Sequence, residues 1–195
     1  MASCDSPGKP EFFPGAKPSP DGLKLLQRLV LIERGAFTTV APRWDNLLPM
    51  GTLTAITVHH TGFPEPFLTD DFAATAEHLR EIHTLHCDPA ERNWADIGYH
   101  YAVDRMGRIW QLRDLRFQGA HVKNHNGRNA GIVLLGNFDL QTPTMPQTIA
   151  LTSLLNFMRD AFRLVNVTTH QKLADTPTSC PGQHLQVFMD QNFRT

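Results

Sequence analysis

Residues 54–61 read T-A-I-T-V-H-H-T, a run of β-branched and apolar residues that ends on two histidines. This composition predicts a short buried strand. In open α/β sheets, ligands and chemistry collect at the carboxyl ends of the strands. Successive strand residues face opposite ways, so His59 and His60 cannot point into the same space. One of them is a candidate ligand and the other supports it or packs. On this stretch alone, a pair of histidines without any site is the simpler explanation.

A second stretch ends in the same way. Residues 165–169, V-N-V-T-T, predict another short strand, and His170 follows it directly. Ten positions later Cys180 occurs in the segment T-P-T-S-C-P-G. Two imidazoles and one thiolate suit tetrahedral zinc with its fourth position left to water, which is the pattern of a catalytic zinc site.

Length and composition are those of an ordinary globular protein. The chain has 195 residues, 41% of them hydrophobic and 19% charged, enough for one domain with or without a tail. Its net charge of −1 gives no electrostatic argument for a nucleic-acid or anionic-membrane partner. No apolar run approaches the ~20 residues that a membrane helix needs.

The N-terminal region differs in composition from the rest. We expect a proline- and glycine-rich arm over residues 1–22 and one folded domain over residues 23–195. The first residues lack the charged and apolar regions of a signal peptide. The protein therefore works inside the cell, leaves it by another route, or has had its signal removed. Three widely spaced cysteines give no disulfide framework.

Helices are expected over residues 71–86, from a capping box at Thr144 and Gln147 to about residue 164, and from about residue 183. Thr69 or Asp70 can cap the first of these helices. Strands are expected over residues 97–104, 108–113 and 131–136, the last a central strand because it is apolar on both faces. His83 and His86 share one face of the first helix. They could bind metal, but packing is preferred because nothing else completes a site there.

Five blocks of sequence occur in an order that resembles a known family. They are T-A-I-T-V-H-H-T-G (54–62), W-A-D-I-G-Y-H-Y-A-V-D-R-M-G-R-I-W-Q-L-R (94–113), G-A-H-V (119–122), N-A-G-I-V-L-L-G-N-F (129–138) and, after His170, T-S-C-P-G (178–182). The set is similar to the zinc amidases, which comprise phage and bacterial N-acetylmuramoyl-L-alanine amidases and animal peptidoglycan-recognition proteins. The resemblance runs from about residue 31 to the C-terminus.

The resemblance implies an α/β fold with a mixed central sheet flanked by helices, and a peptidoglycan cleft over a zinc ion. It matches the metal ligands to His59, His170 and Cys180. It also matches three catalytic positions, which are Tyr99, His121 and Thr178.

Three departures from the family pattern bear on this match. The interval from His170 to Cys180 is about two residues longer than the family's. Thr178 stands where phage enzymes have lysine, although recognition proteins commonly have threonine there. Val133 stands where intracellular anhydro-muropeptide amidases have a glutamate base, which argues for a site of the tyrosine type.

The expected reaction is hydrolysis of the amide between N-acetylmuramic acid and L-alanine of the stem peptide. Zinc would lower the pKa of water to ~7 and polarise the carbonyl. Tyr99 would orient the water or accept its proton, and His121 and Thr178 would bond the oxyanion. Arg113, Asn126 and His60 are candidates for holding peptidoglycan or muropeptides, with structural roles open for each.

Two other functions are open. One is a module that binds peptidoglycan without cutting it, although non-catalytic relatives typically lose the cysteine. The other is a cysteine hydrolase in which His170 activates Cys180 as nucleophile. A function on peptidoglycan implies action at the cell wall, in the periplasm or outside the cell, whereas no signal peptide is visible in the sequence.

Overall fold

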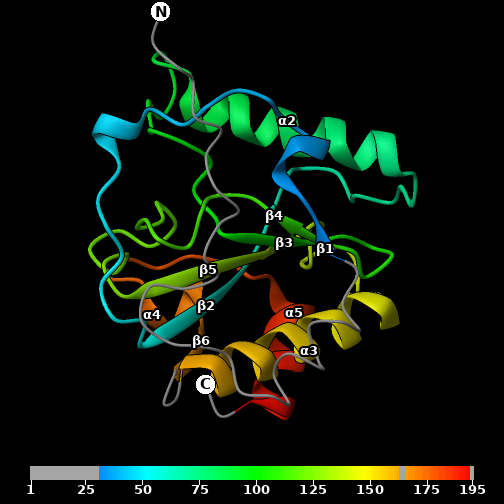
Figure 1. The fold of residues 1–195 in the computed structure, drawn as a ribbon. Helices are drawn as coiled ribbons and strands as arrows, with labels where there is room; N and C mark the ends of the chain where they lie inside the picture. Colours follow the sequence, from blue (N-terminus) through cyan, green and yellow to red (C-terminus); the bar gives the residue numbers. More distant parts are fainter. Residues whose placement is uncertain (1–30, 163–165, 194–195) are drawn as a thin grey trace, which may run out of the picture.

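The computed structural model describes residues 31–162 and 166–193, and the expected arm lies outside these ranges (Figure 1). One six-stranded sheet has the order β1-β4-β3-β5-β2-β6. Only β3 and β4 pair antiparallel, so the sheet is mixed, as expected. The strands are β1 (Leu31–Ile32), β2 (Ala55–His60), β3 (Tyr101–Val103), β4 (Ile109–Gln111), β5 (Asn129–Leu134) and β6 (Asn166–Thr169).

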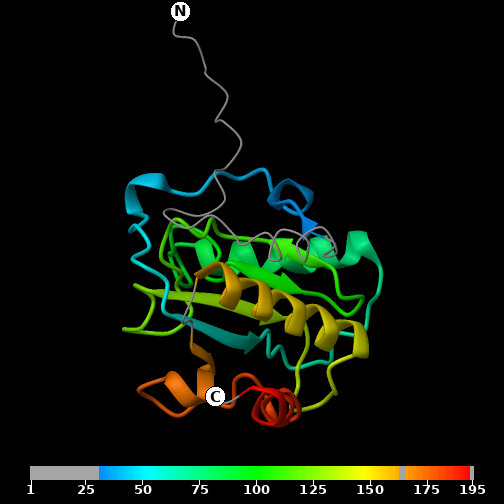
Figure 2. The same ribbon diagram turned by 60° about the horizontal axis from the view of Figure 1, so that its bottom comes forward.

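Helices cover both faces of this sheet, giving three layers (Figures 1 and 2). Helix α2 (Phe72–Cys87) lies on one face, and α3 (Met145–Phe162) with α5 (Gln183–Asn192) lies on the other. Short helical turns are η1 (Arg34–Ala36), η2 (Trp44–Asn46) and α4 (His170–Leu173). Within the described ranges, none of the helices is both long and apolar enough to cross a membrane.

The two faces of β2 have separate packing partners. Ile56 and Val58 belong to the core cluster under α3, together with Leu151. His59 alternates with them and pairs in register with Val133, which belongs to the cluster under α2. His59 therefore faces the α2 layer, whereas His60 faces the α3 layer.

Both long helices begin close to their expected starts, although the cap of α2 is Asp71 and not Thr69 or Asp70. The Asp71 carboxylate accepts a hydrogen bond from the Ala74 amide at 2.7 Å, which caps α2. Before α3, the Gln147 amide donates to the Thr144 hydroxyl at 3.2 Å and the Thr144 amide donates to the Gln147 side chain at 3.1 Å. This reciprocal pair is the expected capping box. Helix α5 begins at Gln183, also as predicted.

The strands agree with expectation in place but not in length. Strand β5 is buried throughout and central, although it starts and ends two residues before the expected range. The strand expected over 97–104 is reduced to β3, because its first part turns to other partners. The Gly98 amide donates to the His86 ring at 3.1 Å, and the Gly98 carbonyl accepts from Ala120 at 2.9 Å.

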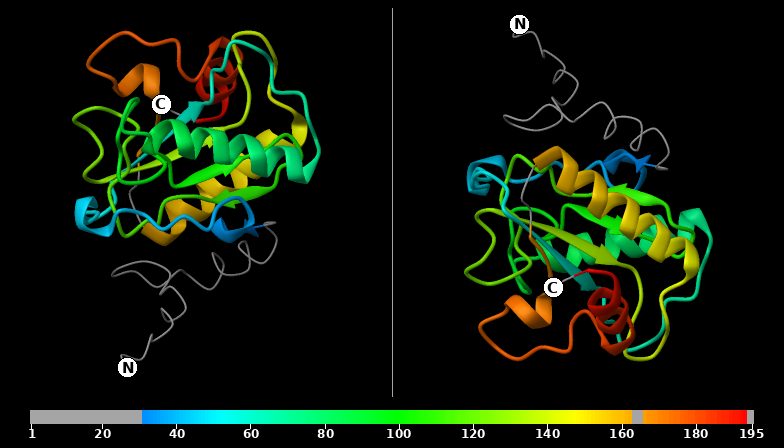
Figure 3. Two further views of the ribbon diagram at one scale, coloured as in Figure 1. Left: turned by 90° about the horizontal axis from the view of Figure 1, so that it is seen from above. Right: turned by 90° about the horizontal axis from the view of Figure 1, so that it is seen from below.

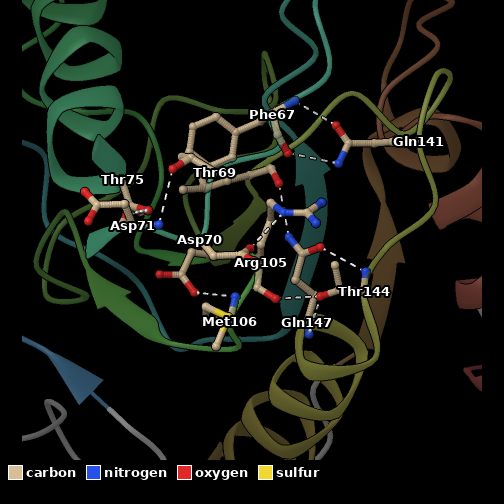
Figure 4. A network of polar contacts seen from close by, with 12 residues as sticks. Phe67, Thr69, Asp70, Asp71, Thr75, Arg105, Met106, Gln141, Thr144 and Gln147 are labelled. Atoms are coloured by element: carbon tan, nitrogen blue, oxygen red, sulfur yellow. Dashed lines mark hydrogen bonds and ion pairs between the residues drawn. The ribbon is translucent and has the colours of Figure 1, made fainter. Parts of the chain in front are cut away.

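A polar network holds the loop after β2 in place (Figure 4). Gln141 exchanges two hydrogen bonds with the backbone of Phe67, at 2.8 and 3.2 Å. Arg105 pairs with Asp70 at 3.0 Å, and its carbonyl accepts from the Thr144 hydroxyl at 2.6 Å. The loop, the β3–β4 turn and the start of α3 are thereby joined.

Candidate metal centre

Three potential metal ligands meet at the carboxyl end of β2. One donor atom each from His59, His170 and Cys180 lies within 4.8 Å of the others. Strands β2 and β6 pair in parallel with Val58 opposite Thr169. His59 is the next residue of β2, and His170 follows β6 directly as the first residue of α4. Helix α4 and the loop after it lie against this end of β2 (Figure 3). The fold thus brings together the three residues selected from the sequence.

The cysteine loop returns to the histidines through local hydrogen bonds. Cys180 Sγ lies 3.6 Å from His59 Nδ1. The Cys180 carbonyl accepts from the Gln171 amide at 2.8 Å, and its own amide donates to the Thr178 hydroxyl at 3.2 Å. These bonds fix both ends of the residue, while the hydroxyl proton of Thr178 can still be donated.

The electrostatics of the site suit a metal that binds neutral imidazole. Burial, followed by the nearby His121 and His170, holds the pKa of His59 well below its ordinary value. Burial also lowers the pKa of His170. Burial raises the pKa of the Cys180 thiol to about 12, so metal binding would have to displace its proton.

His60 lies apart from this group. Its ring faces the other side of the sheet, where Nδ1 accepts a hydrogen bond from the Phe138 amide at 3.2 Å. The side chain is buried, and its ring stacks on that of Phe138 with the two ring centroids 6.3 Å apart. Of the two alternatives for the histidine pair, the structure places His59 with the ligands and His60 in packing.

Tyr99 lies beside the group, with its ring centroid 5.2 Å from that of His59 and 5.7 Å from that of His86. Burial raises the pKa of its phenol above the ordinary value, so the hydroxyl stays protonated at neutral pH. A protonated phenol both donates and accepts a hydrogen bond.

His121 contacts His59 directly. Its Nδ1 lies 3.0 Å from His59 Nε2, and its Nε2 lies 3.2 Å from the Asn129 carbonyl oxygen. Asn126 supports this loop, because its side-chain oxygen accepts from the amides of His121 and Val122 at 3.0 and 3.1 Å. Both ring nitrogens of His121 are therefore engaged by the protein, an arrangement that the sequence did not reveal.

Arg113 is only 6% exposed. Its guanidinium donates to three backbone carbonyls, those of Asp96, Ile97 and Gln118, at 2.8, 2.7 and 2.5 Å. These contacts join the segment before β3 to the loop before His121. Of the two roles open for Arg113, these contacts support the structural one, because the guanidinium that would hold substrate is already bound by the protein.

A second cluster joins His83 and Cys87 of α2 with Asp96, again with donor atoms within 4.8 Å. Arg34 already pairs with Asp96 at 2.8 Å, and Asp96 also pairs with His83 at 3.2 Å. A guanidinium ion so close disfavours a metal cation there. The expectation that nothing else completes a group around His83 was wrong, because Cys87 and Asp96 do so. The role of His83 that these contacts support is an ion pair with Asp96.

Comparison with known proteins identifies the family. The sequence profile of the N-acetylmuramoyl-L-alanine amidase family matches residues 49–183, so the chain belongs to this family. It is 32% identical over 145 residues to human N-acetylmuramoyl-L-alanine amidase, covering 71% of this chain and 23% of the human protein. It is 33% identical over 113 residues to the endolysin of Enterobacteria phage K11, covering 55% of this chain and 72% of the endolysin.

Solved structures agree with the fold. Drosophila peptidoglycan-recognition protein LB superposes with a TM-score of 0.72 at 22% identity, over 83% of this chain and 93% of that one. The amidase LysC of Clostridium intestinale superposes with a TM-score of 0.65 at 22% identity, over 83% and 95% of the two chains. The chain spans about a quarter of the human and mouse amidases that it matches.

Proposed function

We propose that this protein hydrolyses the amide between N-acetylmuramic acid and L-alanine of the peptidoglycan stem peptide, using zinc held by His59, His170 and Cys180. The observation that carries the proposal is the convergence of these three side chains within 4.8 Å. A set of two imidazoles and one thiol matches the ligand types of zinc enzymes that keep a fourth position open. Family membership supports the substrate class.

The protonation state of the two histidines suits zinc binding. Both histidines are held neutral by burial, which is the form that coordinates a metal. When bound, zinc supplies a Lewis acid for the amide carbonyl and lowers the pKa of water to ~7.

Two protein groups would act beside the metal. The protonated Tyr99 hydroxyl would orient the attacking water and exchange a hydrogen bond with it. The Thr178 hydroxyl, two residues before Cys180, would donate to the oxygen on which negative charge develops. One well-placed donor of this kind is typically worth ~3–4 kcal/mol.

The cysteine hydrolase is the less favoured alternative. Its nucleophile would need to be a thiolate next to a base, whereas burial raises the pKa of the Cys180 thiol to about 12 and so favours the protonated thiol. A module that binds peptidoglycan without cutting it would not require the complete donor set. The Drosophila protein LB variant solved with tracheal cytotoxin shows that a protein of this fold can bind a peptidoglycan fragment.

Mass analysis of the products formed from purified muropeptides tests the proposal. The zinc-loaded protein should release free stem peptide and an intact glycan, and a chelator should stop the release. Turnover that survives exhaustive chelation, with an acyl adduct on Cys180, would show the cysteine hydrolase. Retention of uncut peptidoglycan without any product would show the binding module.

A further inference from the structure

We infer that His121 is a positioning residue that fixes the tautomer of His59 and so leaves His59 Nδ1 free to bind metal. The inference rests on the proposed function only in taking His59 as a zinc ligand. It replaces the oxyanion role expected for His121 from the sequence, because both nitrogens of that ring are occupied by protein partners.

The hydrogen positions follow from the chain of contacts. A carbonyl oxygen only accepts hydrogen bonds, so His121 Nε2 carries a proton and donates it to Asn129 at 3.2 Å. A neutral imidazole holds one such proton, which leaves His121 Nδ1 as an acceptor. The proton between the rings, across 3.0 Å, then belongs to His59 Nε2.

The result is a chain of hydrogen bonds with one direction, from His59 through His121 to the Asn129 carbonyl. With its proton on Nε2, neutral His59 has a lone pair on Nδ1, the nitrogen that lies 3.6 Å from Cys180 Sγ. This chain of hydrogen bonds ends at the backbone carbonyl of Asn129 in β5, which can only accept a hydrogen bond. Histidine ligands generally depend on such a partner on the second nitrogen, which fixes the ring and raises its basicity.

Gly131 and Gly119 provide independent support, because the absence of a side chain at these positions makes room for the His121 ring. A Cβ atom built on Gly131 would lie 2.7 Å from two ring atoms of His121 and 3.0 Å from its Nε2. A Cβ atom on Gly119 would lie 2.4 Å from the same ring. The His121 ring therefore fills a space that alanine at either position would partly occupy. This close packing sets the orientation of the ring before any metal binds.

Long-range ¹H–¹⁵N NMR of the metal-free, ¹⁵N-histidine-labelled protein tests the inference without a variant. We expect His59 to carry its proton on Nε2 and His121 to carry its proton on Nε2 as well. A His59 signal with the proton on Nδ1 would overturn the inference. This measurement does not depend on turnover, so failure of the proposed amidase activity would leave its result interpretable.

Zinc affinity, measured by competition with a chromophoric chelator, provides the second test. His121→Leu removes the acceptor and should weaken zinc binding about 10- to 100-fold. His121→Asn keeps an acceptor oxygen close to the position of Nδ1 and should retain most of the affinity. Zinc binding by His121→Leu within twofold of wild type would overturn the inference.

Two further variants separate positioning from general damage to the fold. Gly131→Ala keeps every polar group but displaces the His121 ring, and should weaken zinc binding in the same direction. Lys123→Ala changes an exposed residue of the same loop and should leave both zinc affinity and the His59 tautomer unchanged. Equal loss in Lys123→Ala and His121→Leu would assign the effect to the loop and contradict the inference.

Discussion

His59 Nδ1 and Cys180 Sγ lie 3.6 Å apart although 121 residues separate them in the sequence. Parallel pairing of β2 with β6 brings His170 to the same edge of the sheet. The hydrogen bond from Gln171 to Cys180 then returns the cysteine loop to it. The candidate metal centre thus depends on one strand pairing and one loop closure, and each of its members can be tested separately.

Cys180→Ala should lose zinc affinity and hydrolysis together, because two imidazoles remain where three ligands are needed. Cys180→Asp should retain part of both, since a carboxylate oxygen also binds zinc at ~2.0–2.2 Å. Elemental analysis and turnover on a defined muropeptide measure the two effects. Cys87→Ala is the matched control and should keep about one zinc per chain; loss of zinc from Cys87→Ala instead would place the metal at the second cluster.

Tyr99→Phe should bind zinc and fold normally but lose most of its turnover. Positioned acid–base groups typically contribute ~100- to 10,000-fold to rate, and Tyr99 lies beside His59 with a protonated hydroxyl. Tyr101→Phe is the control, because that tyrosine is buried in the core cluster under α3. An unchanged catalytic constant for Tyr99→Phe on a defined muropeptide would assign the residue to packing.

The His83–Asp96 pair should make stability depend on pH. Its hydrogen bond with Asp96 raises the pKa of the buried His83 from 6.5 to about 9. The folded state therefore holds a proton that the unfolded state releases between these values, and stability from this pair falls as pH rises through that window. The loss should reach about 3 kcal/mol, at ~1.4 kcal/mol per pKa unit.

Denaturant unfolding of wild type and His83→Gln at pH 6.5 and pH 9 measures this effect. The difference between the two proteins cancels contributions that they share, including any from zinc. We expect the stability advantage of wild type to shrink at the higher pH. An advantage that stays constant or grows would contradict a protonated His83.

Thr144→Ala should destabilise the protein by about 1 kcal/mol, the typical effect of losing a helix cap. The hydroxyl caps α3 at Gln147 and also donates to the Arg105 carbonyl, so both bonds would be lost. Thr148→Ala is the control, since that hydroxyl donates to the Met145 carbonyl within the helix. Equal effects of the two changes on the midpoint of thermal unfolding would show that the cap contributes nothing.

Much of the fold was accessible from sequence because local signals and tertiary packing agree. The Thr144–Gln147 pair marks the start of α3, and apolar residues on both faces mark β5 as central. The cap of α2 was expected at Thr69 or Asp70 and lies at Asp71, because several adjacent polar residues offer the same local signal. The alternation of a strand was enough to predict that His59 and His60 face opposite ways, whereas the choice of His59 as the candidate ligand came from the family resemblance. Periodicity failed before β3, where side-chain and loop partners replace the sheet ladder at Gly98.

The partners of individual polar residues could not be predicted. Nothing in the pattern around Arg113 shows that its guanidinium would be used by three carbonyls of nearby loops. The contact between His121 and His59 depends on where an irregular loop lies over β5, which no local spacing encodes. Arg34 likewise reaches Asp96 across 62 positions of sequence.

The most direct test of the central claim is an anomalous difference map at the zinc edge from crystals of the zinc-loaded protein. The account predicts one peak about 2.0–2.1 Å from a nitrogen of each of His59 and His170 and about 2.3 Å from Cys180 Sγ, with Nδ1 as the His59 ligand. A peak at His83, Cys87 and Asp96, or no peak at His59, His170 and Cys180 in crystals grown with excess zinc, would contradict it.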